Sequence, residues 1–223
     1  VEATGKPFDA INVTDQTLLS DHLNPMVNMG AIAICGLIHG ASYEEKFQRL
    51  LELTRKLAGN PDIQLDQDVY LSEKHTGSKN RALAFLLKTY GMLEDDVEEV
   101  LDFYFKACSI SVTSQDLAVI GSVLSSHGTL PDSEERVFDR EYGNYVNAIL
   151  MTCGMYDGSG EFAVRVGIPS KSGVGGGLLS VVDGKMGIGI YGPALDEKGN
   201  SIAGRKILQF LSAKMGLHIF AKK

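Results

Sequence analysis

The sequence contains no tryptophan and only three cysteines, and none of the cysteines forms a C-x-x-C pair. Its five histidines form neither an H-E-x-x-H nor an H-x-x-x-H pattern. These absences argue against a structural zinc site. Because the cysteines (Cys35, Cys108 and Cys153) are odd in number and lie in separate apolar stretches, we expect buried, reduced thiols. Reduced thiols are typical of the cytoplasm, which is therefore the expected location.

Long apolar runs and an excess of positive charge are also missing. No run approaches the roughly 20 apolar residues that span a bilayer, and the opening stretch VEATGKPFDA does not have the pattern of a signal peptide. Lysine and arginine number 21 against 28 aspartates and glutamates, which leaves a net charge of −7. An acidic chain is a poor match for nucleic acid or for an anionic membrane surface. We therefore expect neither of them as a partner.

The chain is long enough for a sizeable core. It has 223 residues, of which 44% are hydrophobic, and chains of this size bury roughly 70% of the surface that they expose when unfolded. We expect one domain over residues 1–223. Because the sequence opens without methionine, in a stretch typical of a loop, we also expect the complete protein to have residues before Val1.

The first two thirds of the chain are dominated by helical patterns. Apolar residues recur at helical spacing, acidic residues precede basic ones, and glycines follow the ends. For the first helix Asn24 is the expected cap, and for the fifth the cap is Thr113 or Ser114. The expected helices are Pro25–His39, Tyr43–Gly59, Ser78–Met92, Asp96–Ser109, Thr113–Gly128 and Glu141–Met155.

The pattern changes after residue 160 to short β-branched or alternating runs with glycine and proline between them. Asp183-Gly184 is a hairpin signal, and a last helix is expected over Gly204–Leu217. The predicted fold class is α/β, with a helical cluster and an antiparallel sheet, rather than a βαβ repeat. The expected extended runs are Glu161–Val174, Leu178–Gly184 and Lys185–Pro193.

Residues 170–177, S-K-S-G-V-G-G-G, are unusually rich in glycine. A phosphate-binding loop is disfavoured, because Lys171 precedes the glycines and a strand rather than a helix follows them. Two alternatives remain, a loose hairpin or a strand without side chains along which a ligand can lie. The tripeptide Lys171-Ser172-Gly173 also matches the K-[ST]-G motif of serine acyl-transfer enzymes that carry S-x-x-K.

Four further motifs accompany K-S-G-V-G-G-G, and together they cover most of the chain. They are N-P-M-V-N-M-G (Asn24–Gly30), S-E-x-x-x-G-x-x-N (Ser72–Asn80), L-D-F-Y-F-x-x-C-S-I (Leu101–Ile110) and C-G-M-Y-D-x-S-G (Cys153–Gly160). In this order the motifs resemble those of the glutaminase family, the amidohydrolases with a β-lactamase-like fold. The resemblance extends from E-A-T-G-x-P-F near the start to G-N-S-x-x-G over residues 199–204.

The resemblance implies hydrolysis of L-glutamine to L-glutamate and ammonia, without a metal or an organic cofactor. It also implies a homodimer or homotetramer. Tyr156 is the catalytic residue that it places in this chain. The substrate-binding residues that it implies are Asn28, Glu73, Asn80, Tyr104, Tyr156 and Val174.

These residue types suit the chemistry of glutamine. Glu73 can pair with the α-ammonium through a charge-assisted bond, and Asn28, Asn80 and Tyr104 can donate to the α-carboxylate without burying further charge. The backbone N–H of Val174 suits an oxyanion donor on the glycine-rich strand. Tyr156 suits a proton shuttle, provided that a cation such as Lys171 lowers its ordinary pKa of about 10.

Each of these residues also has an ordinary structural explanation. Glu73 and Asn80 could lie on helix surfaces, Tyr104 in the core, and Asn28 could be a satisfied buried amide. The family's nucleophile motif is absent, since no lysine here has a serine three residues before it, and the nearest approach is Thr76-Gly77-Ser78-Lys79. We expect the nucleophilic serine and its lysine upstream of Val1.

Two alternatives stay open. The first is another β-lactamase-like serine hydrolase, although that group needs an S-D-N or Y-x-N element and C-G-M-Y-D is a different pattern. The second is an amino-acid-binding relative without catalysis.

Overall fold

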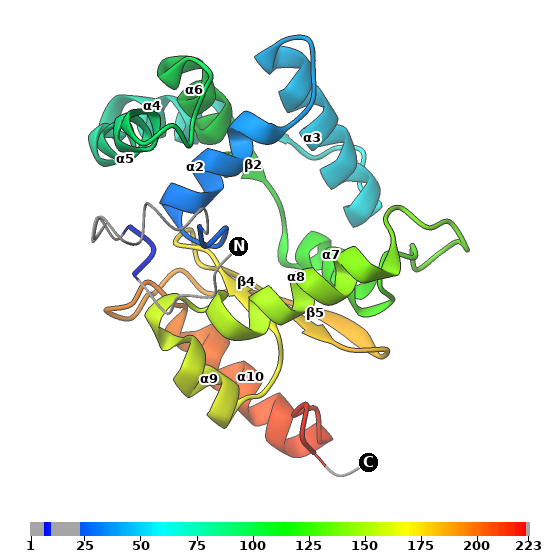
Figure 1. Ribbon diagram of the computed structural model, residues 1–223. Helices are drawn as coiled ribbons and strands as arrows, with labels where there is room; N and C mark the ends of the chain where they lie inside the picture. Colours follow the sequence, from blue (N-terminus) through cyan, green and yellow to red (C-terminus); the bar gives the residue numbers. More distant parts are fainter. Residues whose placement is uncertain (1–6, 10–22, 222–223) are drawn as a thin grey trace. The chain divides into compact units, whose positions relative to one another are not determined.

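The computed structural model describes residues 7–9 and 23–221 and divides them into two compact units (Figure 1). Unit 1 consists mainly of Phe8–Lys56 and Pro61–Ser111, and unit 2 mainly of Leu57–Asn60 and Val112–Lys223. The Glu2–Lys6 part of the E-A-T-G-x-P-F motif lies outside the described residues. That residues 1–223 form one domain stays a prediction.

Unit 1 contains four of the six helices predicted before the strands, and the other two lie in unit 2. Helices α2, α5 and α6 pack against one another, and they bury large apolar side chains such as Ile32, Leu87 and Val100. Two short antiparallel strands, β1 (Gln64–Leu65) and β2 (Ile110–Ser111), pair near the start and the end of the Pro61–Ser111 segment. The helices of unit 1 are α2 (Asn28–Leu37), α3 (Tyr43–Ala58, ending in unit 2), α4 (Gln67–Thr76), α5 (Ser78–Thr89) and α6 (Val97–Cys108).

The start of the first helix differs from the prediction. Helix α2 begins at Asn28, and the predicted cap Asn24 instead accepts a hydrogen bond from Met26 N at 2.9 Å. The Asn24 backbone folds against Gly30, where a Cβ would lie 1.9 Å from the Asn24 carbonyl oxygen. This close approach, which only glycine permits, replaces the predicted first turn by a bend.

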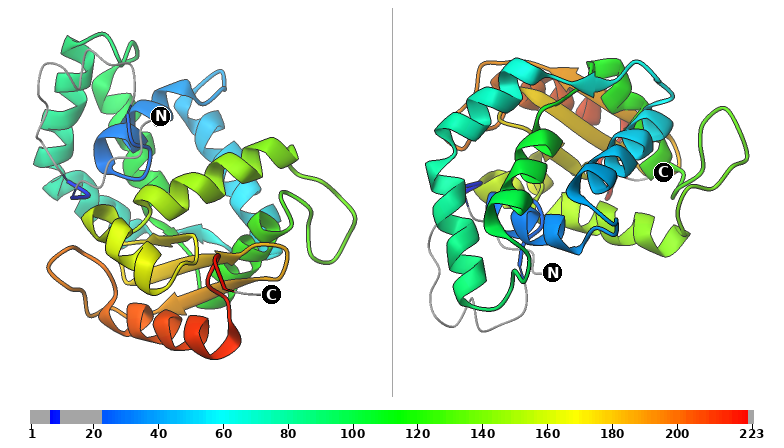
Figure 2. Two further views of the ribbon diagram at one scale, coloured as in Figure 1. Left: turned by 60° about the horizontal axis from the view of Figure 1, so that its bottom comes forward. Right: turned by 90° about the horizontal axis from the view of Figure 1, so that it is seen from above.

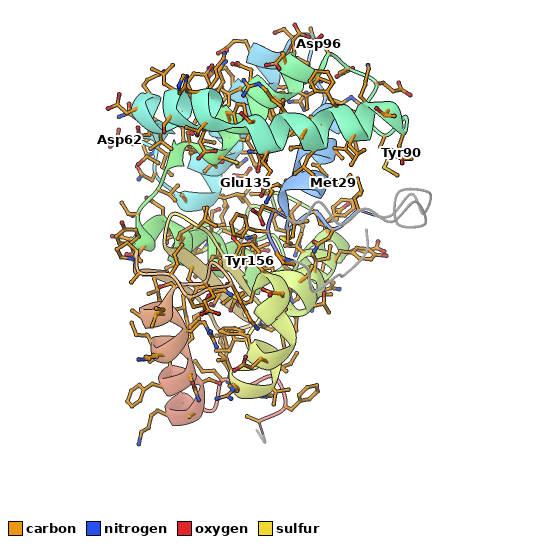
Figure 3. All side chains as sticks on the ribbon, turned by 90° about the vertical axis from the view of Figure 1, so that its left-hand side faces the viewer. Met29, Asp62, Tyr90, Asp96, Glu135 and Tyr156 are labelled. Carbon is orange, nitrogen blue, oxygen red and sulfur yellow. The ribbon has the colours of Figure 1, made fainter. Side chains whose placement is uncertain are left out.

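Helix α4 was not predicted, because its sequence is polar and has little helical periodicity. Its start is nevertheless well specified, since the Asp66 side chain accepts from the N–H groups of Asp68 and Val69. Such a cap satisfies N–H groups that no helical carbonyl can reach. Asp96 (labelled in Figure 3), the first residue of the predicted Asp96–Ser109 helix, is the cap of α6 and accepts the same two bonds, from the N–H groups of Glu98 and Glu99.

Unit 2 contains the predicted antiparallel sheet. Strand β4 lies between β3 and β5, and a turn with Gly184 at φ 63° joins β4 to β5, as the Asp183-Gly184 signal predicts. One predicted strand segment is wrong, since residues 161–165 belong to a helix. The elements are α7 (Ser114–Ser125), α8 (Arg140–Cys153), η1 (Tyr156–Gly158), α9 (Ser159–Arg165), β3 (Ser170–Ser172), β4 (Gly177–Val182), β5 (Met186–Tyr191) and α10 (Ile202–Met215).

The alternation of side chains along β5 explains how the sheet is covered. Gly187 and Gly189 face α7, and a Cβ on Gly189 would lie 1.9 Å from the carbonyl oxygen of Ser114. The missing side chains therefore let α7 lie directly on the strand. The intervening Ile188 and Ile190 point to the opposite face, into the apolar core of unit 2.

That core is completed by α9 and α10, which lie side by side (Figures 1 and 2). Phe162 of α9, Val166 just after α9 and Leu208 of α10 are buried in this core. They share it with Leu178 and Val182 of β4. Phe162 and Val166 are four residues apart, the spacing of one helix face. This burial is the physical reason why the segment is helical despite its β-branched residues.

The cysteines are all thiols, but their burial differs from the prediction. Cys35 and Cys153 are buried, whereas Cys108 is exposed at the end of α6. Burial raises the pKa of the Cys35 thiol to about 12. Among residues 7–9 and 23–221, no helix is both long and apolar enough to cross a membrane, and no three His, Cys, Asp or Glu side chains gather as metal ligands.

Candidate functional site

Two of the predicted substrate-binding residues of unit 1 contact each other directly. The side-chain amide of Asn28, the first residue of α2, donates from Nδ2 to Oδ1 of Asn80 at 2.9 Å. Asn80 lies in the first turn of α5 and is only 8% exposed. The two motifs are 52 residues apart in the sequence, so packing of α2 against α5 brings them together. Two amides side by side offer donors for a carboxylate.

The other two predicted residues of unit 1 are close enough to interact electrostatically. Tyr104 of α6 is buried, and burial is the main cause that raises the pKa of its hydroxyl well above the ordinary value. Cys108, which hydrogen-bonds Tyr104, and the negative charge of Glu73 on α4 raise it further. A raised pKa keeps the Tyr104 hydroxyl protonated, so it is able to donate a hydrogen bond.

Asp102, in the same L-D-F-Y-F motif, ties α4 to α6. Its carboxylate accepts from the Tyr70 hydroxyl at 2.5 Å and from Lys74 Nζ at 2.5 Å, and Lys106 Nζ lies 3.1 Å away. Burial raises the pKa of Asp102, but the hydrogen bonds from Lys74, Tyr70 and Lys106 outweigh it and lower this pKa to about 2. Tyr70 and Lys74 flank Glu73 on α4, so this carboxylate holds the helix that carries Glu73.

We expect Asp102 to make stability depend on pH below pH 4. Its folded pKa of about 2 lies below the unfolded value of about 3.9, so its contribution is complete above pH 4 and is lost as pH falls towards 2. Asp102→Asn should lower the free energy of unfolding at pH 7 by about 1–2 kcal/mol, since solvent screens part of the charged hydrogen bonds. Urea unfolding at pH 7 and pH 3 measures this.

The exposed Asp132 provides the control for this experiment. Asp132→Asn should match the parent at both pH values. An Asp102→Asn variant that loses as much stability between pH 7 and pH 3 as the parent would contradict the assignment.

Tyr156, the predicted catalytic residue, has an unusual backbone in unit 2. It begins η1 and is labelled in Figure 3. Its φ of 55° is left-handed, a conformation that only one other non-glycine residue among those described adopts. The side chain is 3% exposed, and its hydroxyl donates to the carbonyl oxygen of Ser172 at 2.8 Å. Left-handed backbone at a bulky side chain is uncommon and concentrates at functional sites.

Lys171 supplies the cation that the sequence predicts beside this tyrosine. Its Nζ lies 4.5 Å from the centre of the Tyr156 ring and 3.5 Å from the hydroxyl, and it donates to the Ser172 carbonyl oxygen. The ammonium and the hydroxyl thus meet at one carbonyl group. The Ser172 hydroxyl is fully buried and has no hydrogen-bond partner among the described residues. Such a cluster can hold and move a proton at the tyrosine oxygen.

Val174 lies in the turn from β3 to β4 and not on a strand, which corrects the prediction for this residue. Gly173 N donates to Gly177 O, and Gly176 N donates to Gly173 O, both at 2.9 Å. The glycine-rich stretch is therefore a hydrogen-bonded hairpin turn, as one of the two open alternatives proposed. Val174 itself is 51% exposed, and within the part of the chain that the structure describes its N–H makes no hydrogen bond.

The predicted residues thus form one group in each unit. Unit 1 holds Asn28, Asn80, Glu73 and Tyr104, and unit 2 holds Tyr156 and Val174. Sequence reasoning did not assign Asp102, although it stands inside a quoted motif beside Tyr104. Ser159 and Asn200, which contact the Tyr156 turn, also stand inside quoted motifs, but the sequence assigned no role to them.

Unit 2 also has a pocket between α9 and α10, lined by Phe162, Arg165 and Arg205 among others. None of the predicted site residues lines it. Its Arg205 already pairs with Asp196 at 2.5 Å. This pocket therefore contains neither group of predicted residues.

Comparison with known proteins gives a consistent result. The family model described as Glutaminase matches residues 1–220. Glutaminase 2 of Clostridium perfringens is 53% identical over 220 residues, which are 99% of this chain and 72% of that protein. The crystal structure of a probable glutaminase from Bacillus subtilis superposes with a TM-score of 0.93 at 37% identity, covering 97% of this chain and 72% of that one.

A second Bacillus subtilis structure carries a bound molecule. It is the covalent complex of a glutaminase with 5-oxo-L-norleucine, formed by reaction with 6-diazo-5-oxo-L-norleucine. It superposes with a TM-score of 0.87 at 38% identity over 92% of this chain and 74% of that one.

The helices and the antiparallel sheet, with these structural neighbours, define the class as a β-lactamase-like fold. The predicted fold class is thereby confirmed. The chain belongs to the glutaminase family, a family of amide-hydrolysing enzymes.

Proposed function

We propose that this protein hydrolyses the side-chain amide of L-glutamine to L-glutamate and ammonia. The observation that carries the proposal is the Tyr156 hydroxyl, buried beside the Lys171 ammonium at 3.5 Å in a chain of the glutaminase family. A buried hydroxyl next to a cation can pass a proton to the leaving nitrogen of an amide. The left-handed backbone of Tyr156 supports a functional role for this residue, because such conformations concentrate at functional sites.

The residues of unit 1 would recognise the amino-acid end of glutamine. Glu73 pairs with the α-ammonium, while the amides of Asn28 and Asn80 and the Tyr104 hydroxyl donate to the α-carboxylate. The contact of Asn28 with Asn80 holds one amide against the other before substrate arrives. Amides without the amino-acid head would leave these partly or fully buried groups unpaired and would bind poorly.

The proposed reaction proceeds through a serine ester. A serine hydroxyl attacks the amide carbon, ammonia leaves with the proton, and water then cleaves the glutamyl ester. The Val174 N–H is one donor to the oxyanion. The printed sequence has no S-x-x-K, so we assign the serine and its lysine to a segment upstream of Val1. The Bacillus subtilis relative that forms a covalent complex with 5-oxo-L-norleucine supports a nucleophile in this family.

We further propose a homodimer or homotetramer located in the cytoplasm, with residues 1–223 forming one glutaminase domain. The oligomer rests on resemblance to the family. The cytoplasmic location rests on the reduced thiols.

Release of glutamate from L-glutamine by the full-length protein, with L-asparagine as control substrate, tests the function. We expect release from glutamine alone, because the asparagine side chain is one methylene shorter and misplaces its amide. Binding of glutamine without turnover would instead identify an amino-acid-binding relative. Turnover of a β-lactam or peptide in its place would identify another serine hydrolase.

A further inference from the structure

The left-handed backbone of Tyr156 needs support from its surroundings. A residue with a Cβ adopts a φ of 55° only where neighbouring groups hold it there. At the end of η1 the Tyr156 carbonyl oxygen accepts a hydrogen bond from the backbone N–H of Ser159. The supporting contacts come from two motif residues to which the proposed function assigns no role.

Ser159 is the first of them. Its Oγ donates to the Tyr156 carbonyl oxygen at 2.7 Å and accepts from the Met155 N–H at 3.0 Å. One hydroxyl therefore joins the N–H of the residue before Tyr156 to the carbonyl group of Tyr156 itself. Ser159 is 2% exposed, so water does not replace these bonds easily.

Asn200 is the second, and it arrives from a distant part of unit 2. Its Nδ2 donates to the Met155 carbonyl oxygen at 3.2 Å, which also accepts from Gly158 N at 3.0 Å. Asn200 is 1% exposed, and its Oδ1 has no partner among the described residues. A buried amide oxygen left without a partner is unfavourable, and among the described residues this side chain bonds only through its Nδ2 donor.

The position of Asn200 is itself well determined. Its own N–H donates to Asp196 Oδ1 at 3.0 Å. Gly199, at φ 83°, precedes it, and Ser201 caps α10 by accepting from Gly204 N. The G-N-S-x-x-G motif therefore combines a turn, the Asn200 donor and a helix start in six residues.

We propose that Ser159 and Asn200 are positioning residues that hold Tyr156 in its left-handed conformation, so that its hydroxyl meets the Ser172 carbonyl and Lys171. Both act through Tyr156 and touch no substrate. The inference rests on the proposed role of Tyr156 in turnover. Without the side-chain hydrogen bonds of Ser159 and Asn200, the Tyr156 backbone relaxes and the Tyr156 hydroxyl moves away from the Lys171 ammonium.

The test is a double-mutant cycle on the full-length protein with L-glutamine as substrate. Ser159→Ala should lower kcat about tenfold and change KM less than about twofold, the pattern of lost positioning rather than lost binding. In the Tyr156→Phe background the same change should alter kcat less than twofold. Ser159→Thr, which keeps the hydroxyl, should retain most of kcat.

Ser212 provides a matched control, because it is also a buried serine whose hydroxyl donates to a carbonyl, that of Val166 at 2.6 Å. Ser212→Ala should lower thermal stability without changing kcat. If Ser159→Ala does not fold, Asn200→Ala enters the same cycle. The inference would be overturned if Ser159→Ala lowered kcat by the same factor in the parent and in the Tyr156→Phe background. It would also be overturned if Ser159→Ala changed kcat in neither background.

A crystal structure of Ser159→Ala gives a readout that does not depend on activity. If the φ of Tyr156 in this variant lies outside the left-handed region, the positioning role of Ser159 is supported. An unchanged φ overturns it. A parent protein without glutamine turnover would instead refute the proposed function, and unchanged turnover in Tyr156→Phe would remove the role of Tyr156 on which this inference rests.

Discussion

We expect Tyr156→Phe to lower the turnover of L-glutamine by about 10²-fold or more and to leave glutamine binding nearly unchanged. A proton-transfer group contributes on this scale. The substitution removes only the hydroxyl, which donates to Ser172 O at 2.8 Å. The phenyl ring still fits the buried site and still lies under the Lys171 ammonium.

The measurement is glutamate release under saturating glutamine, together with calorimetric titration of glutamine into the variant. Tyr191 on β5 is 65% exposed and provides the control. Tyr191→Phe should match the parent in both assays. Unchanged turnover in Tyr156→Phe would remove this residue from the chemistry, and loss of glutamine binding would assign it to recognition.

The second large effect concerns Glu73. Glu73→Gln should raise the KM for L-glutamine about 10–100-fold, because a hydrogen bond to a charged group contributes about 1.5–3 kcal/mol and 1.4 kcal/mol is tenfold. The variant keeps the size of the side chain and loses only its charge. Since the α-ammonium is remote from the reacting amide, kcat should change much less.

A glutamine analogue makes this test specific. Glutaramate has the same amide and the same carboxylate but no ammonium, so its KM should be alike in the parent and in Glu73→Gln. Glu52→Gln, at an exposed position of α3, controls for net charge. An equal rise of KM for both substrates would show that Glu73 does not bind the ammonium.

Features that depend on neighbours in the sequence were predictable. Helix α3 ends at Ala58 before Gly59, whose φ is 62°, and Thr113 caps α7 in a reciprocal pair of hydrogen bonds with Asp116. The turn at Asp183-Gly184 follows the same logic. In each case one or two residues supply a hydrogen bond or a positive φ within one turn of chain.

Features that depend on distant contacts were not predictable. Residues 161–165 read as a strand and form α9, because Phe162 and Val166 bury one helix face in the core of unit 2. Helix α4 has little apolar periodicity, and its Tyr70 and Lys74 are held by Asp102 on α6. No local pattern reveals a partner that lies some 30 residues away in the sequence.

The sequence by itself determined the family, because the motif letters and their order carry that information, and the side chains expected to bind glutamine are those that the resemblance implies. Only the tertiary structure decided their geometry. The 2.9 Å contact of Asn28 with Asn80 joins two helices, and the hydroxyl of Tyr156 reaches a carbonyl 16 residues further along the chain. The left-handed backbone of Tyr156 is likewise a tertiary outcome. A tyrosine avoids that conformation on its own, and buried hydrogen bonds from the nearby Ser159 and from the distant Asn200 hold it there.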